Sequence, residues 1–399
     1  MPRPLEGIRV LDWTAWQQGP VAAALLADMG ADVIKIEPPE GEAGRGMLRM
    51  YGADLPLNFY YQNQNRGKRG IVLNLAKEKA REVLYKLVEK SDVFMTNYRE
   101  SVVKRLKLDY ETLKKYNPKI IFALSSSFGP EGPDADKMAA DFAGQARGGI
   151  WSITQSEDMV PTPIGAGFAD EVGGVMTAYG ILLAIISRER FGIGQRVDAS
   201  LLGGQIEMGR LQLQMYLMLG VPPPGSMLKA MRNPLYYLYQ DRDGKWFVTA
   251  ALQADRFWPQ FCKVFGIEDL EKDPKFENQL ARGDHFDELM PRLKEIVRTR
   301  SRDEWLKLLD EAGLPAAPVN DYVDLASDPQ VLANDYIVEI EDPVHGKVRV
   351  PGIPVRLSET PGRVERLANE LGQHTEEVLM EICGYTWDDL AKLRDEEVY

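Results

Sequence analysis

Apolar residues in the first third of the chain form short runs that alternate with longer helical stretches. The β-type runs "IRVLDW" and "DVIKIEP" flank "GPVAAALLADMGA", which is rich in helix formers and closes on Gly30. The alternation continues with "GIVLNL" at 70–75, a helical stretch over 77–90, and the β-type runs "SDVFMTN" and "KIIFALSSSFG". Strands that alternate with helices in this way predict an α/β fold with a parallel sheet.

The pattern changes from Gly165 onwards. A long helix is predicted there because apolar residues recur at helical spacing, at Val172, Val175, Met176, Tyr179, Leu183 and Ile186. Arg188 and Arg190 follow, and positive charge suits the C-terminal end of a helix. The stretch "GQRVDASLLGGQIEMGRLQLQMYLMLG" then predicts a short strand and a second apolar helix.

A further change follows "GVPPPGSM", which we interpret as a linker because consecutive prolines stiffen a chain. After it, "GKWFVTAAL" predicts a strand, "ADRFWPQFCKVFG" a helix, and two charged helices follow over 285–299 and 302–311. These elements indicate a smaller α+β domain. "YIVEIEDPVHGKVRVPG" has the pattern of a hairpin around "DPVHG", and the tail from His374 is helical and acidic.

The charge balance limits the partners that this protein can bind. The 399 residues carry a formal net charge of −12, which disfavours broad binding to nucleic acid or to an anionic membrane. An anionic ligand therefore needs a local basic patch. No stretch has the glycine spacing of a dinucleotide-binding or P-loop motif, or the serine elbow of a hydrolase. We therefore expect no permanently bound cofactor and no nucleic-acid partner.

The number and spacing of cysteines and histidines indicate a reducing compartment and argue against a metal-binding site. Cys262 and Cys383 lie far apart, which rules out a disulfide framework, and the three histidines have no short spacing to either cysteine. The N-terminus "MPRPLEGIRV" lacks the apolar core of a signal peptide. The most apolar window, 175–187, spans about 13 residues, whereas a bilayer needs about 20. These features predict a cytoplasmic protein with no metal and no membrane partner.

The stretch "GAGFADEVGG" at 165–174 places two acids in small and apolar surroundings. Asp170 is interpreted either as a helix N-cap or first-turn acid or as a nucleophilic carboxylate, and both roles can hold at once. Glu171 is interpreted as a first-turn acid. Gly173 and Gly174 remove side chains, which we expect to leave room for a bulky acyl group.

Two basic clusters stand out on an otherwise acidic chain: Arg66, Lys68 and Arg69, and Lys104, Arg105 and Lys107. They are interpreted either as surface charges or as clamps for phosphate groups. The loop "VIKIEPPEGEAGR" is either a solvated loop or a ligand-facing loop at the carboxyl end of a parallel strand.

Several motifs, in order along the chain, resemble those of the class III CoA-transferases. This family includes formyl-CoA, carnitine and benzylsuccinate CoA-transferases, together with α-methylacyl-CoA racemases. The resemblance runs from Gly7 to about Ser200 and continues more loosely to the end. It is carried by five stretches: "LEGIRVLDWTAWQQGPVAAALLADMGADVIKIEPPEGEAGR", "NRGKRGIVLNL", "DVFMTNYRESVVKRLKLDYETL", "NPKIIFALSSSFGPEGP" and "FADEVGGVMTAYGILLAI".

The resemblance implies a large Rossmann-like domain built from both chain ends and a smaller central α+β domain. The large domain would comprise 1–200 and 329–399, with a helix and linker at 201–225 and the small domain at 226–328. Two such chains interlock in the family. A homodimer, or a heteromer with a related subunit, is therefore expected.

The resemblance also implies roles for single residues. Asp170 matches the nucleophile of the transferases, and Gln17 matches a glutamine that stabilises the acyl intermediates. Contacts to CoA are implied for Arg45, Leu73, Asn97, Arg105 and Lys137. Where the family often has a CoA-binding arginine, this chain has Pro38, so that contact is not expected here.

Departures from the family pattern favour transfer over racemisation. The racemases carry a His-Asp pair where this chain has Ala140 and Asp141, and a glutamate in the small domain where the nearest residue here is Gln253. Racemisation needs one proton donor and one acceptor on opposite faces of a carbon, and only one candidate remains. A racemase or epimerase and a CoA-binding subunit of a heteromeric transferase stay as alternatives.

The implied reaction moves CoA from an acyl-CoA to a carboxylic acid through an aspartyl anhydride and an aspartyl-CoA thioester, so a CoA thioester is substrate. Candidate oxyanion donors are the Gln17 amide and the backbone N–H groups near 165–167 or at the helix start. An apolar acyl pocket is expected from nearby aromatic residues: Trp13, Trp16, Phe59, Tyr60 and Tyr61. This favours a bulky or aromatic acid, or a substituted succinate with succinyl-CoA as donor.

Overall fold

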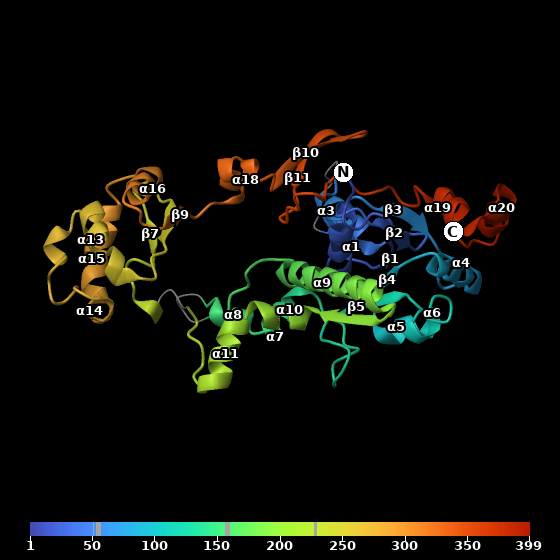
Figure 1. Ribbon diagram of the computed structural model, residues 1–399, viewed down its shortest axis with the longest axis horizontal. Helices are drawn as coiled ribbons and strands as arrows, with labels where there is room; N and C mark the ends of the chain where they lie inside the picture. The colour runs from blue at the N-terminus through green and yellow to red at the C-terminus, as the bar shows by residue number, and fades with distance from the viewer. Residues whose placement is uncertain (51, 53–56, 156–159, 227–229) are drawn as a thin grey trace. The chain divides into compact units, whose positions relative to one another are not determined.

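A parallel sheet of six strands lies at the centre of the first part of the chain, in the order β3-β2-β1-β4-β5-β6 (Figure 1). The strands are β1 (Arg9–Trp13), β2 (Asp32–Glu37), β3 (Arg69–Val72), β4 (Val93–Thr96), β5 (Ile121–Ser126) and β6 (Arg196–Ser200). Every neighbouring pair is parallel. The predicted parallel α/β sheet is therefore confirmed.

The computed structural model describes residues 1–399 except 51, 53–56, 156–159 and 227–229. The chain divides into two compact units. Of the described residues, the first comprises those in 1–155, 160–221 and 333–399, and the second those in 222–332. The division of the chain into domains at 200, 225 and 328 stays a prediction.

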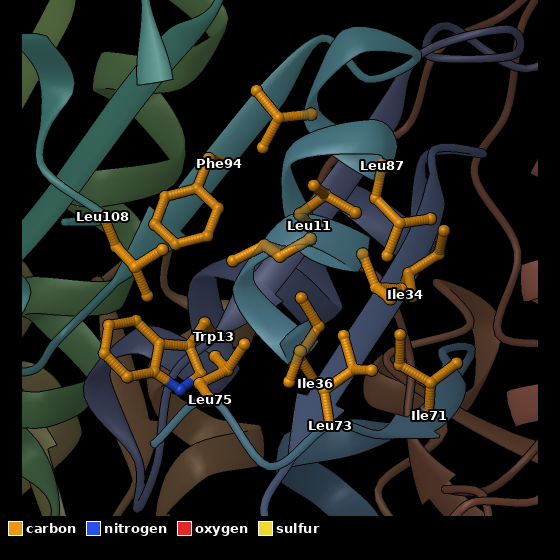
Figure 2. Packing of buried hydrophobic residues seen from close by; sticks show 14 of the residues in the cluster. Leu11, Trp13, Ile34, Ile36, Ile71, Leu73, Leu75, Leu87, Phe94 and Leu108 are labelled. Atoms are coloured by element: carbon orange, nitrogen blue, oxygen red, sulfur yellow. The ribbon is translucent and has the colours of Figure 1, made fainter. Parts of the chain in front are cut away.

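Both faces of the sheet are buried, because alternate residues of each strand enter different apolar clusters. Leu11, Ile34, Ile71 and Phe94 point to one face, where they pack with Leu87 of α4 and other side chains (Figure 2). Residues one position earlier or later, including those of β1, β2 and β4, pack on the other face. Strands covered on both faces read as nearly continuous apolar runs, which is the pattern in this sequence.

Helices cover the two faces of this sheet. One face holds α4 (Glu78–Glu89), α19 (Thr375–Cys383) and α20 (Trp387–Asp395), and the other holds α1 (Gln18–Asp28) and α9 (Phe168–Phe191). Shorter helices fill the connections of the first unit: α2 (Met47–Met50), α3 (Phe59–Asn65), α5 (Glu100–Arg105), α6 (Tyr110–Leu113), α7 (Asp141–Arg147), α8 (Ile150–Ile153), α10 (Leu201–Met208) and α11 (Arg210–Leu219). The C-terminal part adds α18 (Pro329–Ala333) and the predicted hairpin, β10 (Ile337–Asp342) with β11 (Gly346–Pro351).

A three-stranded antiparallel sheet and several helices make up the second unit. The sheet contains β7 (Leu238–Gln240), β8 (Trp246–Thr249) and β9 (Ala316–Pro318). The helices are α13 (Ala254–Phe265), α14 (Gln279–Asp284), α15 (Phe286–Val297), α16 (Arg302–Glu311) and α17 (Tyr322–Leu325). Their core is aromatic, with Phe265 stacked on Trp305 at 5.0 Å between ring centroids. These elements agree with the strand and helices predicted after the proline-rich linker.

The predicted second apolar helix is in fact two helices. The helical segment is interrupted at Gly209, which is the C-cap of α10 and the N-cap of α11. The first apolar helix, α9, is longer than its most apolar window suggested. By length and composition alone it could cross a membrane, but 44% of its most apolar segment is buried. It lies on the sheet and against α1.

Small residues, together with Ile181 and Ile185, form the buried face of α9. The buried positions are Ala169, Gly173, Gly174, Thr177, Ala178, Ile181, Ala184 and Ile185. Val175, Tyr179, Leu183 and Ile186 lie on the other side and are exposed. A methyl group placed on Gly174 would lie 2.7 Å from Val21 Cγ1 and 2.9 Å from the Gln18 carbonyl oxygen. The two helices therefore approach closely at the glycine pair.

Replacing Gly174 with alanine should destabilise the protein, because the added methyl group overlaps backbone and side-chain atoms of α1. We expect the free energy of unfolding to fall by about 1–3 kcal/mol, as in other overpacked cores. Urea denaturation at one protein concentration measures it. Gly209→Ala is the matched control, since its methyl group would lie 3.4 Å from Ile150 Cδ1, an ordinary contact. Equal losses in the two variants would contradict this account.

Candidate active site

Loops that follow β1 and β4 leave the sheet at the point where the strand order reverses. β1 pairs with β2 on one side and with β4 on the other, although β2 and β3 precede β4 in the chain. In open α/β sheets, ligands bind in the crevice outside the carboxyl ends of the strands at such a point. The loop from Thr14 to Gln17 and the residues from Asn97 onwards lie at this edge.

Asp170 is the third residue of α9, and Gly167, with φ 81°, is the N-cap. Its carboxylate accepts no hydrogen bond from any residue that the structure describes. Burial, with a smaller contribution from the negative charges of Asp141 and Glu171, raises the pKa of Asp170 to about 7. Near neutral pH this carboxyl is therefore close to half ionised, and its ionised form is little stabilised.

Asp141, at the start of α7, caps the helix that carries Asp170. Its carboxylate accepts hydrogen bonds from the backbone N–H groups of Gly167 at 2.9 Å, Ala169 at 2.6 Å and Asp170 at 3.3 Å. Gln145 Nε2 donates a fourth at 2.8 Å. The expectation that backbone N–H groups at this helix start serve as oxyanion donors is wrong for these three, because a carboxylate already occupies them.

Gln17 reaches the same helix start from the β1–α1 loop. Its Nε2 donates to Glu171 Oε1 at 3.0 Å and lies 3.4 Å from the Gly167 carbonyl oxygen. The two residues that Gln17 contacts, Gly167 and Glu171, lie before and after Asp170 in the sequence. A methyl group on Gly167 would lie 2.5 Å from Gln17 Nε2, so the approach requires glycine there. The structure thus brings the two predicted catalytic residues, Gln17 and Asp170, to one helix start.

The glycine pair after Asp170 does not provide the expected room for an acyl group. A methyl group on Gly173 would lie 2.7 Å from Gln18 Nε2, and one on Gly174 would meet Val21. The space beside both glycines is filled by α1. Their small size permits the approach of two helices, so the expectation was wrong for a packing reason.

A cavity of about 640 Å³ opens at the carboxyl ends of the strands. Its walls come from the segments after β2, β3 and β4 and from the C-terminal tail, through Pro38, Leu73, Tyr98 and Tyr399 among others. Trp13 packs against Tyr98 in a tilted arrangement, with ring centroids 4.4 Å apart. Burial raises the pKa of Tyr98 to about 12, so its phenol stays neutral. Of the predicted CoA contacts, Leu73 lines this cavity.

The other predicted CoA contacts lie in different settings. Asn97 is bound to the β1–α1 loop, since its Oδ1 accepts from the Ala15 N–H at 2.9 Å and its Nδ2 donates to the Ala15 carbonyl at 2.7 Å. Arg105 is exposed, and within the described part of the chain it has no ion-pair partner. Lys137 is exposed and pairs with Asp134 at 2.5 Å. Their contacts to CoA stay predictions.

Arg45 is held inside the protein. Its guanidinium donates to both oxygens of the buried Glu37 carboxylate at 2.7 Å, to Tyr61 Oη at 2.6 Å and to the Asn369 carbonyl at 3.2 Å. Tyr61 is buried in this contact and lies under the Arg45 guanidinium. Bidentate pairing of this kind fixes the loop after β2.

Neither interpretation of the first basic cluster holds. Lys68 is fully buried and donates to Asp12 Oδ2 at 2.8 Å, to Asn65 Oδ1 at 2.9 Å and to the Pro20 carbonyl at 3.0 Å. Burial lowers the pKa of Lys68 to about 8. Arg66 pairs with Asp28, and Arg69 with Asp32, both at 2.7 Å. All three cations are therefore paired with carboxylates of the chain, Arg69 also with the exposed Glu377 and Glu381, and none is a free surface charge or an open phosphate clamp.

The aromatic residues expected to form an acyl pocket are divided between core and surface. Trp13 and Tyr61 are buried, whereas Trp16 and Phe59 are exposed. Among the residues that the structure describes, no group of three or more His, Cys, Asp or Glu side chains could hold a metal ion. Both cysteines are free.

Comparison with known proteins gives a consistent picture. The model of CoA-transferase family III matches residues 5–375. The chain is 33% identical to a succinyl-CoA–D-citramalate CoA-transferase of Chloroflexus aurantiacus, over 100% of this chain and 98% of that protein. It is 32% identical to a formyl-CoA:oxalate CoA-transferase of Rhodopseudomonas palustris, over 99% and 97%. A crystal structure of a CAIB/BAIF family protein from Brucella suis superposes with a TM-score of 0.85 at 30% identity, covering 96% and 100%.

The raised pKa of Asp170 can be measured without an activity assay. We expect a carboxyl that titrates near pH 7 in the wild-type protein and is missing from Asp170→Asn, seen by carbon-detected NMR of labelled aspartate. Glu171→Gln should lower this pKa by less than about one unit, because burial is the larger cause and persists. An Asp170 that titrates near pH 4 would refute the description of this site.

Proposed function

Because the chain belongs to CoA-transferase family III, we propose that it moves CoA from an acyl-CoA to a carboxylic acid by covalent catalysis on Asp170. The observation that carries this proposal is the Asp170 carboxylate itself. It is partly buried, accepts no hydrogen bond from a described residue, and has a pKa near 7. A carboxylate that is neither paired nor capped retains its nucleophilic lone pairs.

The reaction proceeds by exchange of acyl groups. The Asp170 carboxylate attacks the thioester carbon of the donor acyl-CoA, which forms a mixed anhydride and releases CoA thiolate. The thiolate then attacks the aspartyl carbonyl, which gives an aspartyl-CoA thioester and the free donor acid. The acceptor carboxylate attacks this thioester, and the thiolate released takes the acceptor acyl group from the second anhydride. One thioester is formed for each one broken, so no ATP is required.

Gln17 is the donor that the geometry favours for the developing oxyanion. Its amide lies at the start of α9, whereas three backbone N–H groups there are bound to Asp141. A neutral amide donor stabilises an oxyanion without competing for the nucleophile as a charged group would. We propose that Gln17 exchanges its bond to Glu171 for one to the tetrahedral intermediate.

The cavity lined by Leu73 and Tyr98 is proposed to hold part of the CoA moiety. Arg105 and Lys137 are proposed to meet its phosphates from the exposed surface, and Asn97 to border the same path. For Arg45 we propose an indirect role, because its donors already bind Glu37, Tyr61 and Asn369. A cytoplasmic location agrees with the two free cysteines.

For substrates we propose succinyl-CoA as donor and a substituted succinate as acceptor. The Chloroflexus relative is named for succinyl-CoA and for citramalate, which is a succinate with added hydroxyl and methyl groups. The alternative of a racemase or epimerase is weaker, because the carboxylate of Asp141 is engaged as a helix cap and the side chain of Ala140 has no ionisable group.

A second copy of the chain, or a related subunit, is proposed to cover the apolar side of α9 and α11. No residue of α11 is buried, and Leu211, Leu217, Met218 and Leu219 are each at least two-thirds exposed. Contiguous apolar patches of this kind mark interfaces. We propose the interlocked homodimer of the family as the first alternative and a heteromer as the second.

Substituting the nucleophile should abolish transfer while CoA binding survives. We expect Asp170→Ala to lose at least about 10³-fold in kcat, because the covalent path is removed, with the Kd for CoA within about threefold of wild type. Transfer is assayed with labelled succinyl-CoA and a panel of acids, and the aspartyl adduct is identified by mass spectrometry. Glu189→Gln, at the other end of α9, is the control. Substantial turnover by Asp170→Ala would exclude this mechanism.

Removing the apolar surface of α11 should change the mass in solution. The wild-type chain of 44.9 kDa is expected to sediment at twice that mass or more. Leu217→Glu with Leu219→Glu should shift the population to monomer, because two charges cannot be buried unpaired in an apolar interface. Leu280→Glu, equally exposed but in the second unit, is the control. A monomeric wild type would contradict the proposal.

A further inference from the structure

Trp16 has a left-handed backbone conformation immediately before Gln17. Its φ is 65°, and among the described residues only four other non-glycine residues have a positive φ: Lys107, Arg232, Asp335 and Glu397. For a bulky side chain this conformation is unfavourable by about 1–2 kcal/mol. Such strain persists only where the surroundings enforce it, and it gathers at functional sites.

Side chains from three other segments hold the loop that contains Trp16. Lys35, fully buried on β2, donates its Nζ to the Thr14 carbonyl at 2.7 Å. Asn97, just after β4, binds both the N–H and the carbonyl of Ala15. Two consecutive peptide units of the β1–α1 loop are thereby fixed from two neighbouring strands.

Glu42 holds the second of these peptide units, Ala15–Trp16, from its N–H side, opposite the carbonyl that Asn97 binds. Its Oε2 accepts from the Trp16 N–H at 2.9 Å, and the residue is 6% exposed. The same oxygen lies 3.3 Å from the Gly44 N–H, at the start of the 3₁₀ turn Ala43–Gly46. The other oxygen, Oε1, is buried with no hydrogen-bond partner in the described structure. A buried carboxylate that is only half satisfied is unfavourable, and stability alone does not account for it.

We propose that Glu42 is a positioning residue for the transfer reaction: by holding the Trp16 N–H it maintains the left-handed turn that presents Gln17 to the first turn of α9. The proposal rests on the function proposed above for Asp170 and Gln17. Because Gln17 follows Trp16 directly, a change of φ at Trp16 swings the Gln17 side chain away from Gly167 and Glu171.

Loss of Glu42 should therefore act on catalysis more than on binding. Without the carboxylate, Trp16 relaxes to a negative φ and Gln17 leaves the position from which it meets the oxyanion. That donor acts in the tetrahedral step, so kcat falls whereas the KM for the acyl-CoA changes little. A side chain with only a structural role would instead lower the amount of folded enzyme and leave kcat per folded site intact.

The test is a double-mutant cycle between Glu42 and Trp16. We expect Glu42→Ala to lower kcat on the order of 10–100-fold, with KM for succinyl-CoA within about threefold. Trp16→Gly removes the strain, because glycine adopts φ near +65° readily. In the Trp16→Gly background, Glu42→Ala should therefore lower kcat by less than about threefold.

Asn58→Ala provides the matched control for the 3₁₀ turn. Asn58 Nδ2 donates to the Gly44 and Arg45 carbonyls, both at 3.0 Å, so it holds the same turn as Glu42 without touching Trp16. Its kcat should stay within about threefold of wild type, which separates loosening of this turn from release of Trp16.

Hydrogen exchange gives a readout that does not depend on the reaction. In Glu42→Ala the amide of Trp16 should exchange faster by at least about tenfold, with peptides outside 14–21 and outside the 3₁₀ turn that Glu42 caps unchanged. If the wild type transfers no CoA, the proposed function fails, and exchange at Trp16 still tests the clamp. An equal loss of kcat in both backgrounds, no loss in Glu42→Ala, or unchanged exchange at Trp16 would each overturn the proposal.

Discussion

The close crossing of α1 and α9 is the constraint on which the candidate site depends. Gly174 lets the backbone of α9 approach Gln18 and Val21 of α1 to within van der Waals contact. The residue that precedes Gln18 in the chain is Gln17, and the first turn of α9 carries Asp170. Two residues separated by 153 positions therefore lie at one helix start, because the glycines of α9 let the two helices approach closely. If α9 had a larger residue at position 174, the two helix starts would separate and Gln17 would lose its contacts to Gly167 and Glu171.

Asp141 sets the electrostatic character of the same helix start. A free helix N-terminus favours the ionised form of a first-turn acid, but here Asp141 already neutralises that dipole and adds its own negative charge. Burial raises the pKa of Asp170 to about 7, and the charge of Asp141 contributes to this shift as a smaller cause. A carboxyl with a raised pKa binds its proton more tightly in the folded chain than in the unfolded one. The stability that Asp170 contributes is therefore complete below about pH 4 and is lost as the pH rises through about 7. The ionised form of Asp170 is thus held at the expense of stability, a common feature of active sites.

Local sequence patterns predicted the sheet, because each strand and helix of an α/β fold has its own periodicity. β1, β2 and the helices of the second unit were recognisable in this way. The bond from Asp141 to α9 was not, because a cap supplied from 26 positions upstream leaves no local pattern. Nor did the cluster at Arg66, Lys68 and Arg69 reveal that its charges are internal, since the partners Asp28, Asp12 and Asp32 belong to other elements. The stripe that includes Val175 and Tyr179 has helical spacing, but spacing alone does not say which side of a helix faces the core. The family resemblance, by contrast, identified Asp170 and Gln17 as a pair, and the fold brings them to one place.

The two faces of the sheet differ at its carboxyl edge, and this difference has a mechanical consequence. On the face that carries α4, the strand ends stay apolar down to Trp13 and Leu73. On the face that carries α1, Asp12, Lys35 and Lys68 are fully buried. Lys68 donates to Asp12 and to the Pro20 carbonyl of α1, and Lys35 donates to the Thr14 carbonyl of the β1–α1 loop. Apolar contacts are not directional, so they permit small shifts, whereas buried charges with fixed donors and acceptors do not. The loop that carries Gln17 is therefore fixed by its polar side, while the cavity beside Leu73 and Tyr98 has the apolar walls that suit a ligand with aromatic and aliphatic parts. A single sheet edge in this way supplies a rigid half beside Gln17 and an apolar half beside Leu73, which suits the covalent chemistry and the CoA site proposed above.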